Sequence, residues 1–292
     1  MKQGRVTKLI GGQYTVKDAQ NRAVVLKPRG KFRHLDLSPK VGDIVFFDEE
    51  RILDMKPRKN ELERPPIANI DQAILIHSAK EPAFSFTLLD RFLVMVEHKD
   101  IAPLIVVTKV DLMDANDMHE LRRSMVHYER HYSVLYVTVH NRASVEALKP
   151  AIKDKVSVFA GQTGSGKSSL LNALDIRLKL KTDAISKALG RGKHTTRHTE
   201  LLDLHGGLVA DTPGFSKLSF GDVDESDIAQ CYPDFIEVAD ACKFRACRHI
   251  DEPGCAVKAA VDAGDIPPQR YARYHAIYEE IKTTEKTYRK KE

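Results

Sequence analysis

The stretch of sequence that decides the fold is Gly161-Gln162-Thr163-Gly164-Ser165-Gly166-Lys167-Ser168. An apolar segment, Val156–Phe159, precedes it and reads as a strand, and the apolar-rich segment Leu170–Leu174 follows it and reads as a helix. A glycine-rich loop in this setting, ending in Gly-Lys-Ser, fits the Walker A pattern. The glycines let backbone N–H groups turn toward phosphate groups, and the helix N-terminus favours their negative charge. The sequence therefore predicts a phosphate-binding loop.

Individual residues of this loop have predicted roles. Lys167 can reach the β- and γ-phosphates of a nucleotide, and the Ser168 hydroxyl can bind Mg²⁺. Residues 161–166 and Ser169 are expected to surround the phosphates. The alternative, a glycine-rich turn without a ligand, does not explain why a strand and a helix flank the motif.

Outward from the loop, residues 66–220 alternate short apolar strands with helical segments. The expected strands are Ile70–Ile76, Leu104–Val107, Val134–Val139 and Val156–Phe159. The expected helices are Thr87–Glu97, His119–His131, Ser144–Ile152 and Lys167–Leu174. This alternation predicts a parallel sheet with helices on both faces.

A second motif, Thr108-Lys109-Val110-Asp111, follows the strand expected at 104–107. It resembles the Asn/Thr-Lys-x-Asp motif with which GTPases read guanine. The Asp111 carboxylate can accept hydrogen bonds from guanine N1–H and the exocyclic amine together, and adenine offers no such donor pair. The Lys109 stem can lie along the base, and the loop at Thr138 would supply a backbone N–H to guanine O6. These residues predict a guanine nucleotide, GTP or GDP, as the ligand.

The segment Asp211-Thr212-Pro213-Gly214 resembles the Asp-x-x-Gly switch of GTPases. The resemblance implies that Asp211 holds Mg²⁺ through water and that the Gly214 N–H meets the γ-phosphate. Thr195 and Thr196 precede it at a spacing suitable for the other switch. Thr196 is the favoured Mg²⁺ ligand when γ-phosphate is present.

The residue after the switch glycine is Phe215. Ras-like enzymes have a glutamine there that orients the attacking water, and phenylalanine cannot do so. Intrinsic GTP hydrolysis is therefore expected to be slow. His194 and His198 flank the switch threonines and are candidate catalytic residues for positioning water, with a phosphate or RNA contact as the alternative role.

The order of these motifs is permuted, because the base-reading loop precedes the phosphate loop. The chain resembles the circularly permuted ribosome small-subunit-dependent GTPase A family over essentially its whole length. The resemblance implies binding to the small (30S) ribosomal subunit, through 16S-type rRNA and ribosomal proteins, during late maturation. It also implies GTP hydrolysis that the subunit stimulates.

Residues 1–65 form the expected N-terminal domain, an OB-type RNA-binding barrel. The five expected strands are Arg5–Ile10, Gln13–Val16, Arg22–Leu26, Val41–Phe47 and Ile52–Met55. This segment has 15 Lys and Arg against 9 Asp and Glu, so it accounts for the chain's net charge of +5. The loop at 27–34 alternates basic residues with Phe32, a pattern that suits phosphate contact and base stacking. Arg64-Pro65-Pro66 is expected to be a stiff linker.

Residues 221–292 contain all four cysteines and end in a helical pattern. Cys242, Cys247, His249 and Cys255 have the spacing C-x4-C-x-H-x5-C, which predicts a closed tetrahedral site for structural Zn²⁺. Buried thiols with a chance histidine are the alternative. Cys231 lies outside the pattern and is expected to be a packed free thiol. Tyr271, Tyr274, Tyr278 and Ile281 recur at helical spacing, which indicates core packing.

The 292 residues are thus expected to form a multidomain α/β protein with domains at 1–65, 66–220 and 221–292. The first is the barrel, the second the permuted GTPase and the third the zinc-binding helical domain. No apolar run approaches the length of a membrane span, and the start resembles no secretory signal, so a cytoplasmic protein without a membrane partner is expected. A monomer is also expected. Two other functions remain open. They are an RNA-binding module with a vestigial or sensing nucleotide site, and an ATP-dependent phosphotransferase.

Overall fold

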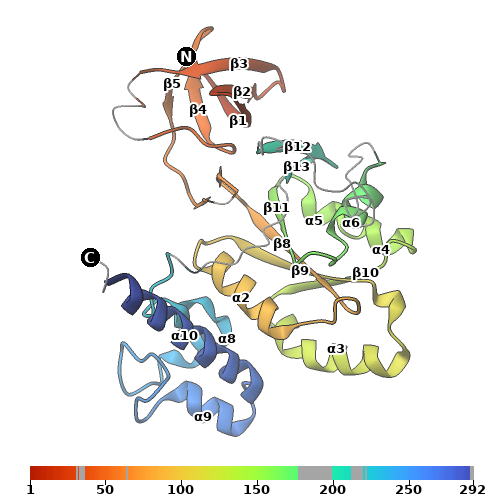
Figure 1. Ribbon diagram of the computed structural model, residues 1–292, viewed down its shortest axis with the longest axis vertical. Helices are drawn as coiled ribbons and strands as arrows, with labels where there is room; N and C mark the ends of the chain where they lie inside the picture. Colours follow the sequence, from red (N-terminus) through yellow and green to blue (C-terminus); the bar gives the residue numbers. More distant parts are fainter. Residues whose placement is uncertain are drawn as a thin grey trace.

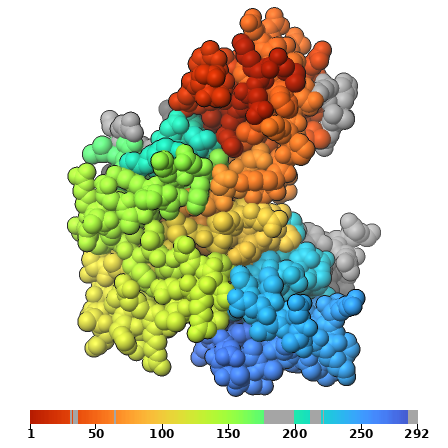
Figure 2. All heavy atoms as spheres, turned by 180° about the vertical axis from the view of Figure 1, so that it is seen from behind, coloured from red at the N-terminus to blue at the C-terminus, as the bar shows by residue number. Residues whose placement is uncertain are grey.

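The computed structural model describes residues 1–30, 32, 37–63, 65–176, 199–211, 220 and 222–289 (Figure 1). The N-terminal strands lie at one end of the molecule, the C-terminal helices lie at the other, and the central sheet lies between them. The same sequence of parts is visible from behind (Figure 2).

Five strands near the N-terminus close into a barrel. They are β1 (Lys2–Ile10), β2 (Gln13–Asp18), β3 (Ala23–Pro28), β4 (Ile44–Phe47) and β5 (Arg51–Met55). Their order is β1-β2-β3-β5-β4, and β4 pairs back with β1. Alternate side chains of a strand point to the same face, and in the barrel one of these faces is the interior. Val6, Val16 and Val45 lie on this inner face and are fully buried. The barrel confirms the five-stranded prediction.

A short hairpin connects the barrel to the central sheet. It consists of β6 (Glu61–Leu62) and β7 (Ile67–Ala68), and Pro65 and Pro66 of the expected linker lie in its turn. Arg58 reaches back from this side to the buried Asp43 of the barrel, with 2.8 Å between Nη2 and Oδ2. An ion pair, in addition to the chain connection, therefore holds the barrel to the segment that follows it.

The central sheet is parallel over five strands, as expected. They are β8 (Gln72–Ser78), β9 (Ala102–Thr108), β10 (Ser133–Val137), β11 (Val156–Ala160) and β13 (Gly207–Asp211). Their order is β10-β9-β8-β11-β13. All seven residues of β8 are buried, as befits a central strand with both faces covered.

Helices cover both faces of this sheet, as predicted. On one face, α2 (Phe86–Glu97) and α3 (Ala115–Glu129) pack against the side of β8 that includes Leu75. On the other face, three helices pack against the side that includes Ile76. These three are α4 (Arg142–Glu146), α5 (Lys149–Ile152) and α6 (Lys167–Leu174).

The single helix expected at Ser144–Ile152 is wrong, because two short helices occupy this stretch. The first ends at Glu146 and the second begins at Lys149. Pro150 lies in the first turn of α5, where its missing N–H costs nothing, whereas inside one continuous helix it would remove a hydrogen bond.

The sheet also extends in a way that the sequence did not indicate. Strand β12 (Glu200–Leu204) runs antiparallel to β13 and, on its other side, pairs with β1 of the barrel. Barrel and central sheet thus form one 11-stranded sheet.

The C-terminal helices pack around a second apolar core. They are α8 (Pro233–Ala239), α9 (Ala256–Ala263) and α10 (Pro268–Arg289), preceded by the 3₁₀ turn Ile228–Cys231. Tyr274, Tyr278 and Ile281 of α10 are buried there and Tyr271 is partly buried against them, which confirms the predicted packing stripe. None of the helices described is long and apolar enough to cross a membrane.

A buried polar network attaches these helices to the central region. The Arg270 side chain, only 1% exposed, donates from Nε and Nη2 to Asp234 at 2.7 and 2.8 Å. Its Nη1 donates to Asp90 of α2 at 2.7 Å. From α3, the Tyr128 hydroxyl also donates to Asp90 at 2.7 Å, and His127 Nε2 lies 3.0 Å from Asp234. Four helices therefore share one buried cluster of charges.

Candidate nucleotide site and metal centre

The phosphate loop lies between β11 and α6, as predicted. A side chain at Gly161 would place its Cβ 2.4 Å from the Ile76 carbonyl oxygen, so only glycine allows this approach to β8. Gly166 caps α6 with a φ of +87°, in the left-handed region that glycine adopts without strain. The loop geometry accounts for the glycines of the motif.

The functional side chains of the motif lie at the start of α6. Lys167 is its first residue, and its Nζ donates to the Gly161 carbonyl at 3.1 Å. Ser168 and Ser169 follow in the first turn, where backbone N–H groups have no partner within the helix. This arrangement can bind phosphate and can offer a hydroxyl to a cation.

The base-reading loop begins where β9 ends. Thr108 is buried, and its hydroxyl donates to the Ser165 carbonyl of the phosphate loop at 2.6 Å. Lys109 has a left-handed backbone (φ +57°), and a 3₁₀ turn, Val110–Leu112, follows. Asp111 in this turn is exposed. The two loops that the sequence predicts separately are thus in direct contact.

The third predicted loop, after β10, lies beside Asp111. The Thr138 hydroxyl donates to the Asp111 carboxylate, and this bond is the main reason that the pKa of Asp111 is lowered. The Thr138 backbone N–H donates to Ser144 Oγ at 3.1 Å. Among the described residues, no hydrogen-bond partner is found for the Val139 N–H, so it is the donor that this loop leaves available.

One cavity brings the three loops together. Its lining comprises Thr108, Lys109, Asp111, Leu112, Val137, Thr138, Val139, His140, Gly166, Ser169 and Leu170. A carboxylate lies at its rim and the start of α6 borders it, while Val137 and Leu170 are buried. A cavity of this kind accepts a flat base with hydrogen-bonding edges.

Some contacts of this site were not predicted from the sequence. Lys109 Nζ donates to the Glu81 carbonyl, and Pro82 lies against Gly164. The loop after β8 therefore supports both the base-reading loop and the phosphate loop. Ser144 also holds the Thr138 carbonyl, with Oγ donating at 2.9 Å. Nothing in the local sequence marks these residues, because their role depends on neighbours from other strands.

The predicted switch residues are only partly described. Asp211 is the last residue of β13, and β13 runs parallel to β11. The backbone of Asp211 therefore lies at the same end of the sheet as the phosphate loop. The side chain of Asp211 and the residues His194, Thr195, Thr196, His198, Gly214 and Phe215 lie outside the described part of the structure.

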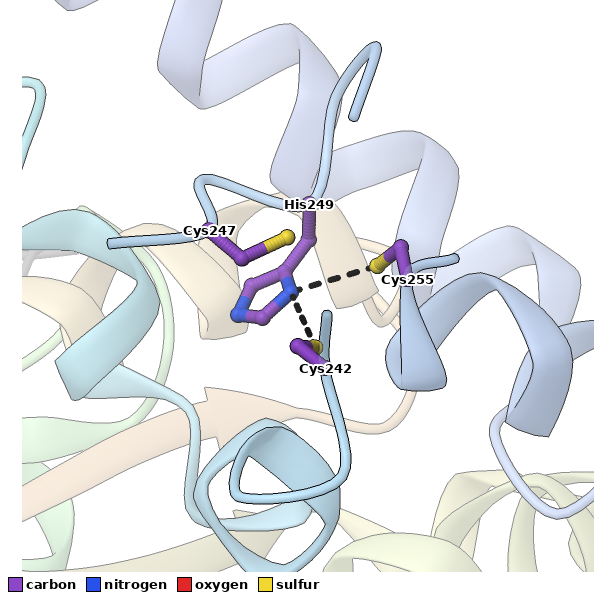
Figure 3. A group of neighbouring side chains, drawn as sticks. All are labelled: Cys242, Cys247, His249 and Cys255. Atoms are coloured by element: carbon purple, nitrogen blue, oxygen red, sulfur yellow. Dashed lines mark hydrogen bonds between the residues drawn. The ribbon is translucent and has the colours of Figure 1, made fainter. Parts of the chain in front are cut away.

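The four predicted metal ligands come together in the C-terminal region (Figure 3). Their ligand atoms all lie within 4.8 Å of one another. His249 Nδ1 is 3.7 Å from Cys242 Sγ and 3.3 Å from Cys255 Sγ. Tetrahedral Zn²⁺ with Zn–S bonds of about 2.3 Å and Zn–N bonds of about 2.0 Å separates sulfur from nitrogen by about 3.5 Å. The observed spacing fits this ion.

The surroundings of these ligands also suit a structural metal. His249 is buried, which lowers its pKa and keeps the ring neutral as metal binding requires. The Ala256 N–H donates to Cys242 Sγ at 3.2 Å, and the Tyr271 hydroxyl donates to the His249 carbonyl at 2.7 Å. Cys231 lies apart as a buried free thiol, and burial raises its pKa to about 12.

Basic residues are exposed near both ends of the molecule. Lys27 and Arg29 of the predicted basic loop are exposed, whereas Lys31, Arg33 and His34 lie outside the described residues. Lys243 and Arg245 are exposed between the metal ligands. Arg248 is paired, with its Nη1 2.7 Å from Glu225.

Comparisons with known proteins agree over the whole chain. A family described as RsgA GTPase matches residues 55–221, and one described as RsgA N-terminal domain matches residues 3–52. Small ribosomal subunit biogenesis GTPase RsgA 2 of Oceanobacillus iheyensis is 48% identical over 294 residues, covering 99% of this chain and 100% of that protein. RsgA of Bacillus subtilis is 44% identical, with the same coverage of both chains.

Two solved structures are similar throughout. The crystal structure of YloQ, a circularly permuted GTPase, has a TM-score of 0.84 and 41% identity, covering 97% of this chain and 96% of that one. YjeQ from Thermotoga maritima has a TM-score of 0.84 and 34% identity, with coverage of 96% and 98%.

Proposed function

The chain belongs to the RsgA family of GTPases, and we propose that it binds GTP between its three nucleotide loops and hydrolyses it on the maturing small ribosomal subunit. The relatives named above are small ribosomal subunit biogenesis GTPases. Their similarity covers 99% of this chain and so includes the barrel, the central sheet and the C-terminal region, and all three parts are proposed to serve this function.

The observation that carries the proposal is the cavity shared by the three loops. Asp111 would accept hydrogen bonds from guanine N1–H and from the exocyclic amine, with its carboxylate held by Thr138. Guanine O6 would take the Val139 N–H, since the Thr138 N–H is already bonded to Ser144. This donor and acceptor pattern matches guanine and opposes adenine, so an ATP-dependent phosphotransferase is disfavoured.

The phosphates would lie on the loop at 161–166 and the start of α6. Lys167 would exchange its contact with the Gly161 carbonyl for the β- and γ-phosphates. Ser168, Asp211 and Thr196 are proposed to hold Mg²⁺, directly or through water, and the Gly214 N–H to meet the γ-phosphate. Bound Mg²⁺ neutralises charge that develops on the transferred phosphoryl group.

Positioning of the attacking water needs a group other than Phe215. His194 and His198 are proposed for this role because they flank the predicted switch threonines. Intrinsic hydrolysis is then slow, and contact with the subunit orders the catalytic residues.

The Cys242–Cys255 ligand set is proposed to bind one Zn²⁺. Three thiolates and one imidazole fill all four tetrahedral positions, so the ion would stabilise the fold and take no part in chemistry. The segment between the ligands has little apolar surface of its own, which is why a metal is needed to order it.

Ribosomal RNA of the small subunit is the proposed partner of the barrel. The positive charge of residues 1–65 favours phosphate contacts, because neutralising RNA phosphates releases counterions. The protein is proposed to act in the cytoplasm as a monomer.

The decisive experiment measures phosphate release from GTP with and without purified small subunits, with Lys167→Ala as the control variant. The proposal expects strong stimulation by the small subunit, no stimulation by the large subunit, and no activity of the variant. A slow rate that subunits do not change would instead favour an RNA-binding module with a sensing or vestigial nucleotide site.

A further inference from the structure

The barrel contacts the central sheet at a strand between the two predicted switches. Strand β12 begins at Glu200, shortly after Thr196 in the sequence, and the next strand, β13, ends at Asp211. The barrel therefore pairs with the only stretch of described backbone that connects the two switch segments.

The strand register makes this relationship specific. Lys8 of β1 lies opposite Glu200 of β12, and Glu200 lies opposite Asp211 of β13. Three residues thus form one row across three strands. Since neighbouring strands are about 4.8 Å apart, the backbone of Lys8 lies about 10 Å from that of the predicted switch aspartate.

Side chains reinforce the contact between the barrel and β12. Lys8 Nζ lies 2.7 Å from Glu200 Oε2, and Lys17 pairs with Asp203 farther along the strand. Leu201 is buried in the apolar cluster that also contains Val6 of the barrel. The contact therefore combines a backbone pairing, two ion pairs and buried apolar surface.

The barrel has a second attachment, to the chain segment that follows it. Arg58 pairs with Asp43, and Val41 forms an isolated parallel bridge with Ile67. The barrel is thus attached both to β12, between the switches, and to the segment that contains Arg58 and Ile67. A shift of β12 relative to that segment would therefore change the orientation of the barrel.

We propose that the β1–β12 junction couples the nucleotide site to the barrel. A γ-phosphate that draws on Asp211 shifts β13 and β12, and the barrel follows through the Lys8–Glu200 row. By thermodynamic reciprocity, RNA bound to the barrel then changes the affinity for GTP by the same factor by which GTP changes the affinity for RNA. This inference rests on the proposed function, because it assumes GTP and RNA as the two ligands.

Amide hydrogen exchange on the full chain tests the coupling without ribosomal subunits. The protein is compared with bound GDP and with a non-hydrolysable GTP analogue. We expect exchange in β1 to differ between the two states by about five-fold, the lower end of typical coupling between two sites. The difference should disappear in Lys8→Glu and return in the charge-exchanged variant Lys8→Glu/Glu200→Lys.

Arg22→Glu is the matched control, since it reverses a charge on the barrel and breaks the ion pair with Asp18, and neither of these residues pairs with β12. This variant should keep the wild-type difference. If both nucleotides bind but exchange in β1 is the same in both states, or if Lys8→Glu retains the difference, the coupling is wrong and the proposed function stands. If neither nucleotide binds, as measured by titration calorimetry, both are wrong.

Discussion

The Thr108 hydroxyl donates a 2.6 Å hydrogen bond to the carbonyl oxygen of Ser165, which is 57 residues later in the chain. Both groups are buried, and both belong to loops that border the cavity shared by the three predicted loops. The commoner residue at position 108 in this motif is asparagine, and the threonine hydroxyl here takes up a contact with the phosphate loop. One short side chain therefore joins the base-reading loop directly to the phosphate loop.

Thr108→Val should weaken GTP and GDP binding because it removes this bond and leaves a buried carbonyl without its donor. A hydrogen bond of this kind contributes about 0.5–1.5 kcal/mol, so affinity should fall by about two- to ten-fold. Titration with a fluorescent guanine nucleotide measures the change. Thr87→Val, on the exposed start of α2, is the matched control and should bind as wild type does. An unchanged affinity for Thr108→Val would show that the loops hold their spacing without the bond.

Asp111→Asn should reverse the base preference. The amide can donate to the O2 carbonyl of xanthine but cannot accept both hydrogen bonds from guanine. Loss of a charge-assisted pair costs about 1.5–3 kcal/mol, so GTP affinity should fall by at least ten-fold while XTP affinity rises. Competition of GTP, XTP and ATP for one fluorescent nucleotide measures this directly. Equal loss for all three nucleotides would mean that Asp111 supports the loop and does not read the base.

Purified protein should contain about one equivalent of zinc, and Cys255→Ser should lose it. Zinc binding is coupled to folding, so the variant should unfold at a markedly lower temperature, as would the native protein after treatment with a chelator. Elemental analysis and thermal denaturation are the measurements. Cys231→Ala, a buried thiol outside the ligand set, should keep its zinc. Zinc content below half an equivalent in native protein would argue against the site.

Arg270→Met should be strongly destabilising, because the buried carboxylate of Asp234 loses its guanidinium partner and that of Asp90 keeps only Arg273. Breaking a buried ion pair from one side costs about 3–5 kcal/mol. Urea unfolding measures the loss. Adding Asp234→Asn to Arg270→Met should recover much of it, since Asp90 keeps its pair with Arg273 and no unpaired carboxylate of this group remains. If the single variant is as stable as wild type, the network does not hold α10 to α2.

The contribution of the same network to the stability of the fold should decrease in acid. Burial alone would raise the pKa of Asp234, but the hydrogen bonds from Arg270 and His127 outweigh it and lower that pKa. A carboxyl with a lowered pKa stabilises the fold above the unfolded value near 4, and this contribution decreases as the pH falls below it.

His77 should make the protein less stable in mild acid. It lies in β8 with its ring 5.5 Å from Phe84 and 5.6 Å from Phe92, and neither ring nitrogen has a hydrogen-bond partner among the described residues. Burial lowers its pKa to about 4. The unfolded chain takes up a proton near pH 6.5, so stability falls as the pH decreases from about 6.5 toward 4, by about 2 kcal/mol at pH 5.

His77→Leu should remove that part of the pH dependence. The comparison is the difference in unfolding free energy between pH 7 and pH 5, in wild type and variant, which cancels contributions from the metal ligands that both proteins share. Equal differences in the two proteins would show that His77 already has a partner for its proton.

Some features could be predicted from the sequence, because their chemistry requires particular residue types at short, fixed spacings along the chain. The bounds of α6, the turn at Asp111 and the gathering of Cys242, Cys247, His249 and Cys255 all follow from short motifs. The two helices in place of one at 144–152 could have been inferred from Pro150, whose effect depends on its position in a turn.

Other features depend on contacts between distant parts of the chain. Arg270 and Asp90 are 180 residues apart, and the pairing of Lys8 with Glu200 joins a barrel strand to a strand that the sequence did not indicate. Ser144 looks like any helix-start serine until Thr138 is placed beside it. Such contacts arise from packing, and no local periodicity encodes them.

The order of the parallel strands has a consequence for synthesis on the ribosome. Strand β8 ends at Ser78, but the strand that covers its second edge, β11, begins only at Val156. As the chain emerges, β8, β9 and β10 can pair early. Until β11 is made, β8 is then an edge strand whose central residues are all apolar. Open strand edges invite pairing with other chains. In the permuted order, β11, the strand before the phosphate loop, therefore covers this edge of β8, and the same step brings the phosphate loop next to the base-reading loop.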